Sequence, residues 1–213
     1  MKIYDWRLAP NPRRVRMFLA EKGLNIPLEE VGAENMRLKP DFVTRFEPYA
    51  TTPLLELDDG TCISEAMAIC RYLEELHPEP RLMGASPKER AIVEMWERRA
   101  YEGGMFAISE MLRNTHPAFA DRGLPGTSEA IKQVADMKER GEGRLRRLSK
   151  SLDRQLASNR FVTGAHFTVA DVTAFCALDF LINAAQIAIP PELANLRRWY
   201  DEVRERPSAR ASA

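Results

Sequence analysis

The first 23 residues place a short turn, Arg7-Leu8-Ala9-Pro10, directly before the start of a helix, an arrangement that can stabilise a negative charge. Residues 2–6 predict a strand, and apolar side chains at helical spacing predict a helix over residues 11–23. We expect Asn11 to cap this helix, Pro12 to occupy its first position and Gly23 to end it. Unpaired N–H groups and the positive end of the helix dipole favour an anion there, including a thiolate. The same pattern also fits an ordinary strand–helix unit without chemistry.

The composition argues against several classes of function. The 213 residues contain 31 Lys plus Arg and 31 Asp plus Glu, so the formal net charge is zero. A zero net charge gives no global support for binding nucleic acid or an anionic membrane surface. The sequence shows neither an apolar run long enough to span a bilayer nor a secretory signal pattern at its start. We therefore expect a globular protein without a nucleic-acid or membrane partner.

The cysteines and histidines indicate the compartment and argue against a metal site. Cys62, Cys70 and Cys176 are odd in number, widely spaced and set among apolar residues, so they predict free thiols. Free thiols are typical of a reducing compartment, and we expect the protein to be cytoplasmic. The three histidines are too scattered along the chain to predict a metal site.

Proline- and glycine-rich breaks between residues 77 and 87 divide the chain into an N-terminal α/β part, residues 1–80, and an all-helical part, residues 87–213. Strand and helix signals alternate in the first part as βαβ and then ββα. Its further predicted segments are an edge strand at 25–31, a short helix at 40–46, a hairpin at 54–63 and a helix at 66–77 capped by Ser64.

The clearest signals in the second part are helix N-terminal capping motifs. Ser86-Pro87-Lys88-Glu89 and Thr168-Val169-Ala170-Asp171 both read as capping boxes, and we assign Asp171 to folding rather than to catalysis. The remaining expectations are a kink at Gly103-Gly104, a helix over 129–156, and a last helix opened by Pro190 and closed by Pro207.

Five segments in this order resemble the cytosolic glutathione transferases. They are the helix at 11–23, Thr52-Pro53-Leu54-Leu55, the hairpin and helix over 58–75, the capping box within 164–173, and the helix over 195–200 followed by Arg206-Pro207. The resemblance implies a thioredoxin-like glutathione-binding domain at residues 1–80 and an all-helical domain at 87–213 that contributes the second-substrate pocket. It also implies a homodimer.

The resemblance implies a set of glutathione contacts. Thr52, before a cis Pro53, would exchange backbone hydrogen bonds with the cysteinyl part of glutathione. The Glu-Ser pair of the family reads Glu65-Ala66 here, so Glu65 would pair with the γ-glutamyl ammonium and the Ala66 N–H with its carboxylate. Lys39 is the candidate for the glycyl carboxylate.

The sequence departs from the family at the thiol. The usual catalytic Ser or Cys falls on Ala9, which offers neither a hydrogen-bond donor nor a nucleophile, and Pro10 has no N–H. The nearest side-chain donor is Asn11, which is therefore the candidate catalytic residue. The alternative is that Asn11 only caps the helix. Tyr4 lies in the first strand, where some classes keep a tyrosine, but its register fits a core or interface residue.

The resulting hypothesis is a glutathione transferase that joins the glutathione thiolate to a small hydrophobic electrophile, in detoxification, with glutathione as co-substrate and no metal. The acceptor is expected against Tyr101, Met105, Phe106 and Phe175. The alternative, supported by Ala9 and Ala66, is a non-catalytic glutathione-binding or structural module of the same fold. A thiol–disulfide oxidoreductase is disfavoured, because no cysteine lies at the start of the first helix.

Overall fold

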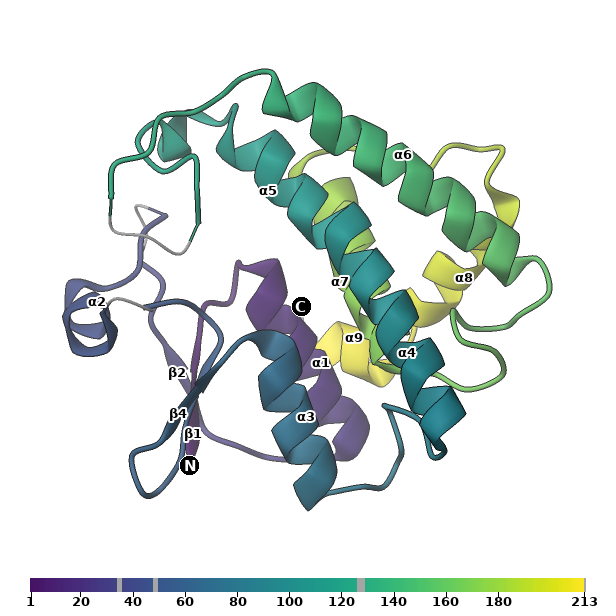
Figure 1. Ribbon diagram of the computed structural model, residues 1–213, viewed down its shortest axis with the longest axis horizontal. Coiled ribbons are helices and arrows are strands. Elements are labelled where there is room, and N and C mark those ends of the chain that lie inside the picture. The colour runs from purple at the N-terminus through teal and green to yellow at the C-terminus, as the bar shows by residue number, and fades with distance from the viewer. Residues whose placement is uncertain (34–35, 48–49, 126–128, 213) are drawn as a thin grey trace.

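Four strands form a mixed sheet in the order β2-β1-β3-β4 in the computed structural model, which describes residues 1–33, 36–47, 50–125 and 129–212 (Figure 1). β1 (Lys2–Asp5) pairs in parallel with β2 (Leu28–Glu30) and antiparallel with β3 (Leu54–Glu56). β3 pairs antiparallel with β4 (Cys62–Ser64). β2 lies at the edge of the sheet, as the preceding Pro27 predicts.

The sheet carries apolar side chains on both faces, because successive residues of a strand point to opposite sides. Ile3 joins the large core with helices α1 (Pro10–Lys22) and α3 (Ala66–Leu76). Tyr4, the next residue, joins a smaller core with Phe42 of helix α2 (Pro40–Phe46). Two helices on one face and one on the other give the thioredoxin-like arrangement that the strand and helix order predicts.

The rest of the chain is helical, and its most buried helix is α7. Figure 1 shows α4 and α5 as one long run, with α6 beside α5. The elements are α4 (Pro87–Ala100), the π-helical turn η1 (Tyr101–Met105), α5 (Phe106–Arg113), the 3-10 turn η2 (Pro117–Phe119), α6 (Met137–Leu156), α7 (Val169–Ala184), α8 (Ala194–Arg204) and α9 (Pro207–Ala211). No helix among the described residues is long and apolar enough to cross a membrane.

Both capping boxes are present, at Ser86–Glu89 and Thr168–Asp171. The predicted kink at Gly103-Gly104 is the turn η1. A Cβ on Gly103 would lie 2.7 Å from the Leu148 Cβ, and one on Gly104 would lie 2.8 Å from the Ala177 Cβ. Glycine is therefore required for η1 to approach α6 and α7 this closely.

Four predicted helix boundaries need correction. α1 begins at Pro10 with Ala9 as its N-cap, since proline is favoured in the first turn of a helix. Glu65, not Ser64, is the N-cap of α3. α8 begins at Ala194, after Pro190, and Pro207 opens the further helix α9 instead of closing the last one.

The predicted start of α6 at residue 129 is also wrong, because the preceding segment is bound to the end of α5. The Gln133 side-chain amide donates to the Arg113 and His116 carbonyls, each at 2.8 Å. The Val134 N–H donates to Asn114 Oδ1 at 2.9 Å. These long-range hydrogen bonds replace helical ones, so α6 begins only at Met137.

α1 joins the two parts of the molecule. It packs against α7 and α9, and Arg13 of α1 pairs with Asp179 of α7. Residues 77–86, all of them described, form no helix or strand. The division into domains at residues 80 and 87 stays a prediction.

Candidate functional site

A pocket of about 360 Å³ lies between the starts of α1 and α3 and the run from η1 to α5. It gathers residues that are distant in sequence but were predicted to act together: Asn11, Thr52, Pro53, Glu65, Ala66, Tyr101, Met105 and Phe106. A larger open groove of about 1300 Å³ between α3 and α4 is lined by none of them. We therefore place the candidate site in the smaller pocket.

Two helix starts meet in this pocket. Neither α1 nor α3 has an N-cap side chain bonded to its first N–H groups, and neither has an acidic residue in its first turn. The first turn of α3 presents unpaired N–H groups from Ala66 onward, whereas α1 presents only that of Asn11, because Pro10 and Pro12 have none. These groups and the two helix dipoles make the pocket favourable for negative charge. A ligand with two separated anionic groups fits this arrangement.

Asn11 does not cap α1. It lies in the first turn, inside the helix, and the α1 N-cap makes no side-chain hydrogen bond. Arg14 Nη1 donates to Asn11 Oδ1 at 3.0 Å. An arginine has only donors, so the amide oxygen must face Arg14 and the NH₂ group must face away from it. No acceptor among the described residues contacts that NH₂, and Asn11 is one of the residues that line the pocket.

Arg14 is held in place from the helical part of the molecule. Its side chain is only 3% exposed, and it donates to Thr173 Oγ1 at 3.0 Å and to Glu97 Oε1 at 2.5 Å. Its guanidinium carbon also lies 5.4 Å from the centre of the Tyr101 ring. The Asn11 amide is therefore fixed by a buried arginine whose other partners come from α4 and α7.

The peptide bond between Thr52 and Pro53 is cis, as the resemblance implies. Glu65 has a φ of 69°, a left-handed conformation that is costly for a residue other than glycine and that recurs at functional sites. The Glu65 side chain is exposed, and no cation among the described residues pairs with it. Its carboxylate is thus available to a ligand beside the start of α3.

The pKa of the Tyr101 hydroxyl is raised by its position in the pocket. Burial raises the pKa of the Tyr101 hydroxyl, and the negative charge of Glu65 raises it further. Tyr101 therefore stays a neutral phenol at physiological pH. Tyr101 lines the pocket together with Glu65 and Ala66 at the start of α3.

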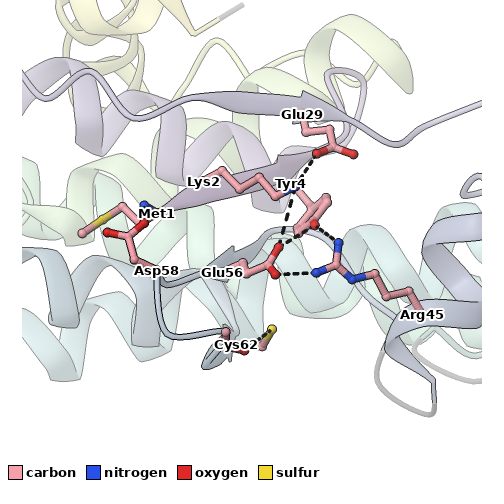
Figure 2. Close-up of polar contacts among 9 residues, drawn as sticks. Met1, Lys2, Tyr4, Glu29, Arg45, Glu56, Asp58 and Cys62 are labelled. Atoms are coloured by element: carbon pink, nitrogen blue, oxygen red, sulfur yellow. Dashed lines mark hydrogen bonds and ion pairs between the residues drawn. The ribbon is translucent and has the colours of Figure 1, made fainter.

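Tyr4 is not placed to act on a ligand in the pocket. Figure 2 shows its hydroxyl between Glu56 and Arg45 on the outer side of the sheet. The hydroxyl donates to Glu56 Oε2 at 2.6 Å and accepts from Arg45 Nη1 at 2.8 Å. With its proton engaged and its ring in the small core, Tyr4 is the core residue that its register predicts.

Two predicted site residues do not line the pocket, and the prediction for Phe175 is wrong. Lys39 is exposed and its ammonium donates to the Glu30 carbonyl at 2.6 Å, so its contact with the glycyl carboxylate stays a prediction. Phe175 is fully buried and stacks on Tyr200, with ring centres 5.5 Å apart. Phe180, on the same helix, lines the pocket instead. Nearly every residue of α7 is buried, so hydrophobic periodicity carried no signal for the face that meets the pocket.

The cysteines lie outside the pocket. Cys62 is exposed, Cys70 and Cys176 are buried, and all three are free. Burial raises the pKa of Cys70 to about 12 and that of Cys176 to about 11, so both are unreactive thiols. Within the described ranges, no three His, Cys, Asp or Glu side chains are grouped so that they could hold a metal ion.

The fold and the pocket define a thioredoxin-like protein with a helical C-terminal part. Residues 9–76 match the family described as glutathione S-transferase, N-terminal domain, and residues 135–202 match the glutathione S-transferase, C-terminal domain. Glutathione S-transferase 2 of Saccharomyces cerevisiae is 32% identical over 99% of this chain and 88% of the yeast protein. The chain therefore belongs to the glutathione S-transferase family.

Solved structures agree with this assignment. A glutathione S-transferase domain-containing protein of Marinobacter aquaeolei VT8 has a TM-score of 0.85 and 38% identity, covering 98% of this chain and 100% of that one. Gtt2 of Saccharomyces cerevisiae has a TM-score of 0.87 and 28% identity, with both chains covered completely. The whole chain, not only one part of it, is similar to these proteins.

Proposed function

We propose that the protein is a glutathione transferase that joins the thiolate of glutathione to a small hydrophobic electrophile. The observation that supports it best is the Asn11 amide, whose NH₂ is turned away from Arg14 and free to bind a ligand in the pocket. Membership of the family and the anion-favouring helix starts support the same function.

In this proposal the pocket holds glutathione in an extended conformation across the two helix starts. Glu65 pairs with the γ-glutamyl ammonium, and the free N–H groups at the start of α3, beginning with Ala66, bind its carboxylate. Thr52 exchanges backbone hydrogen bonds with the cysteinyl part. The thiol then lies at the start of α1, near Asn11 and without a contribution from Ala9.

The chemistry required of the protein is the ionisation of the thiol. The Asn11 amide and the α1 dipole stabilise the thiolate, which attacks the electrophilic carbon while a leaving group departs or a proton is taken up. The acceptor packs against the apolar side chains of Met105, Phe106 and Phe180. These contacts favour a small apolar molecule but do not define one reactive group.

Two measurements test this function. Calorimetric titration with millimolar glutathione is expected to show binding, and a neutral acceptor such as 1-chloro-2,4-dinitrobenzene is expected to be conjugated. Absence of both heat and thermal stabilisation would remove the transferase hypothesis. Binding without conjugation would favour the alternative, a non-catalytic glutathione-binding or structural module, which the missing hydroxyl groups at Ala9 and Ala66 support.

Glu65→Gln is expected to weaken glutathione binding by about tenfold, since it removes a charge that pairs with the ligand ammonium. The free energy of unfolding should change by less than about 0.5 kcal/mol, because the Glu65 side chain is exposed and has no partner among the described residues. Calorimetry and urea denaturation measure the two effects. Unchanged affinity would show that the ammonium is bound elsewhere.

Ala66→Ser is expected to strengthen glutathione binding by up to roughly 1 kcal/mol, the net value of one hydrogen bond. The hydroxyl would be added at the start of α3, where the γ-glutamyl carboxylate is expected. Comparison of dissociation constants at one pH measures the effect. An unchanged constant would indicate that the γ-glutamyl end lies away from Ala66.

We further propose a cytoplasmic homodimer that acts in detoxification. The open groove between α3 and α4 supports the dimer, since Met67 and the exposed Met95 line it and would be covered by a second copy. Multi-angle light scattering is expected to give twice the chain mass of 24.2 kDa. The three free cysteines support a reducing compartment.

A further inference from the structure

Arg113 is a cation in the pocket that the proposed chemistry does not use. It is the last residue of α5, is partly buried, and lines the pocket together with Leu112 and Phe119. Figure 1 shows the end of α5 beside the connection that leads to α6. The part of this helical run that lines the pocket extends from Tyr101 in η1 to Arg113 at the end of α5.

The guanidinium of Arg113 is held in place by two contacts, but no negative charge pairs with it. Its Nη1 donates to the Arg122 carbonyl at 3.1 Å, and its central carbon lies 4.9 Å from the centre of the Phe119 ring. Arg122 stacks on the same ring at 5.0 Å. In the part of the chain that the structure describes, no carboxylate forms an ion pair with Arg113, and its remaining N–H groups have no acceptor.

The surroundings of Arg113 are electrostatically positive. Burial and the positive charge of Arg122 lower the pKa of Arg113 to about 10. Asp121 does not compensate, because its ion pairs are with Arg37 at 3.1 Å and with Arg122 at 3.8 Å. A partly buried charge without a partner is unfavourable, and such charges are normally paired. An anionic ligand would remove this cost.

The position of Arg113 at the end of α5 offers another explanation, because a cation in the last turn is favoured by the helix dipole. That explanation does not account for the unpaired N–H groups or for the placement in the pocket. Tyr101 lines the pocket with Glu65, and its ring centre lies 5.4 Å from the guanidinium carbon of Arg14 in α1. Arg113 is twelve residues further along the helical run, roughly 18 Å at the rise of an α-helix. Arg113 is therefore far from the γ-glutamyl end.

We propose that Arg113 binds a carboxylate of the second substrate, so that the preferred acceptors are small aromatic electrophiles with an anionic group remote from the reacting carbon. This inference rests on the proposed transferase function. The planar guanidinium fits a carboxylate through two parallel hydrogen bonds. Phe106, Leu112 and Phe119 supply apolar contacts for the aromatic ring.

The reaction of such an acceptor is balanced without a further reactant. With 4-chloro-3,5-dinitrobenzoate, the glutathione thiolate attacks the ring carbon that carries chlorine, a carbon–sulfur bond forms, and chloride leaves with the electron pair of the broken bond. The carboxylate is unchanged and stays bound to Arg113. The corresponding carboxamide reacts in the same way but carries no charge.

The test compares the binding of the two conjugates, so that it does not depend on the rate of catalysis. Calorimetry is expected to show that the wild type binds the carboxylate conjugate about tenfold or more tightly than the carboxamide conjugate, as one charged hydrogen-bond pair allows. Arg113→Met should abolish that preference, because it weakens the carboxylate conjugate much more than the carboxamide conjugate, whose oxygen loses only a hydrogen bond to an uncharged group. Arg113→Lys should retain part of it. The matched control Arg147→Met removes an exposed arginine outside the pocket and should have no effect.

Equal affinity of the wild type for the two conjugates, or a preference that survives in Arg113→Met, would overturn the inference. Glutathione alone should bind Arg113→Met as it binds the wild type. A loss there equal to that of the carboxylate conjugate would assign Arg113 to the glycyl carboxylate of glutathione and overturn the acceptor role. Melting temperatures verify that each variant is folded. If Arg113→Met does not fold, the comparison is made with Arg113→Lys, which keeps the charge but not the planar guanidinium.

Failure of the proposed function gives a different result, because the wild type would then neither bind glutathione nor conjugate the neutral carboxamide. In that case, the free 4-chloro-3,5-dinitrobenzoate and its carboxamide replace the conjugates in the same titrations. A preference for the acid that Arg113→Met abolishes would support the carboxylate site. Equal affinity would overturn it.

Discussion

Asn11→Ala is expected to lower the rate of glutathione conjugation at pH 7 by about tenfold or more. The thiol of glutathione has an unperturbed pKa near 8.5, so it is mostly protonated at neutral pH. The α1 dipole contributes roughly 0.3–1 kcal/mol to the thiolate, which is less than one pKa unit. A hydrogen bond from the Asn11 NH₂ adds about 1.5–3 kcal/mol and is the larger contribution.

The pH dependence and a second variant separate this role from a structural one. Raising the pH to 9 ionises the thiol directly, so the deficit of Asn11→Ala should shrink. Asn11→Asp should be less active than Asn11→Ala, because a carboxylate repels the thiolate. It should nevertheless be as stable as the wild type, because the carboxylate still accepts from Arg14.

The measurements are conjugation rates, thiolate absorbance of bound glutathione against pH, and melting temperatures. Asn11→Ala leaves Arg14 with its contacts to Thr173 and Glu97, so a stability loss of only about 1 kcal/mol is expected. If both variants leave the titration of the bound thiol unchanged, the Asn11 amide has no catalytic role. The thiolate would then depend on backbone N–H groups and the α1 dipole.

Asp171→Ala is expected to lower the free energy of unfolding by about 3 kcal/mol or more. The Asp171 carboxylate is fully buried. It accepts from the Val162 N–H at 2.8 Å, the Thr168 N–H at 3.0 Å and the Trp199 Nε1–H at 2.8 Å. Alanine leaves three buried donors without an acceptor, and each costs about 1–3 kcal/mol.

Urea denaturation measures this loss, and two variants serve as controls. Asp171→Asn keeps the shape and one acceptor oxygen, so its loss should be smaller. Asp136→Ala removes an exposed carboxylate that makes no cap hydrogen bond at the start of α6, so it should cost no more than about 1 kcal/mol, the interaction of one charge with the helix dipole. The affinity of folded Asp171→Ala for glutathione should match that of the wild type, because Asp171 is outside the pocket. Normal stability with abolished activity would contradict the assignment to folding.

The sequence by itself determined the local features of this fold. Gly23 ends α1 in a left-handed conformation, and Ser86 and Glu89 form their capping box, because the groups that bond to each other are only a few residues apart. The alternation of Ile3 and Tyr4 placed one side chain on each face of the sheet for the same local reason. Such signals predicted most strands and helices, with errors mainly at their ends.

Motif resemblance identified residues that the fold then brought into one pocket, including Thr52, Glu65 and Met105. The resemblance did not define which contacts the other predicted site residues make. Lys39 carries the expected charge, yet its ammonium is bound to the Glu30 carbonyl. The sequence pattern does not show which of several nearby acceptors the Lys39 ammonium binds.

The tertiary structure alone decided the features on which the site depends. The Asn11 amide is oriented by Arg14, and Arg14 is fixed by Glu97 and Thr173, which are 83 and 159 residues away in the chain. Arg113 meets the pocket, although in the sequence it is one charged residue among many. Local patterns carry no information on contacts across such separations, because these contacts form only when α1, α4 and α7 pack together.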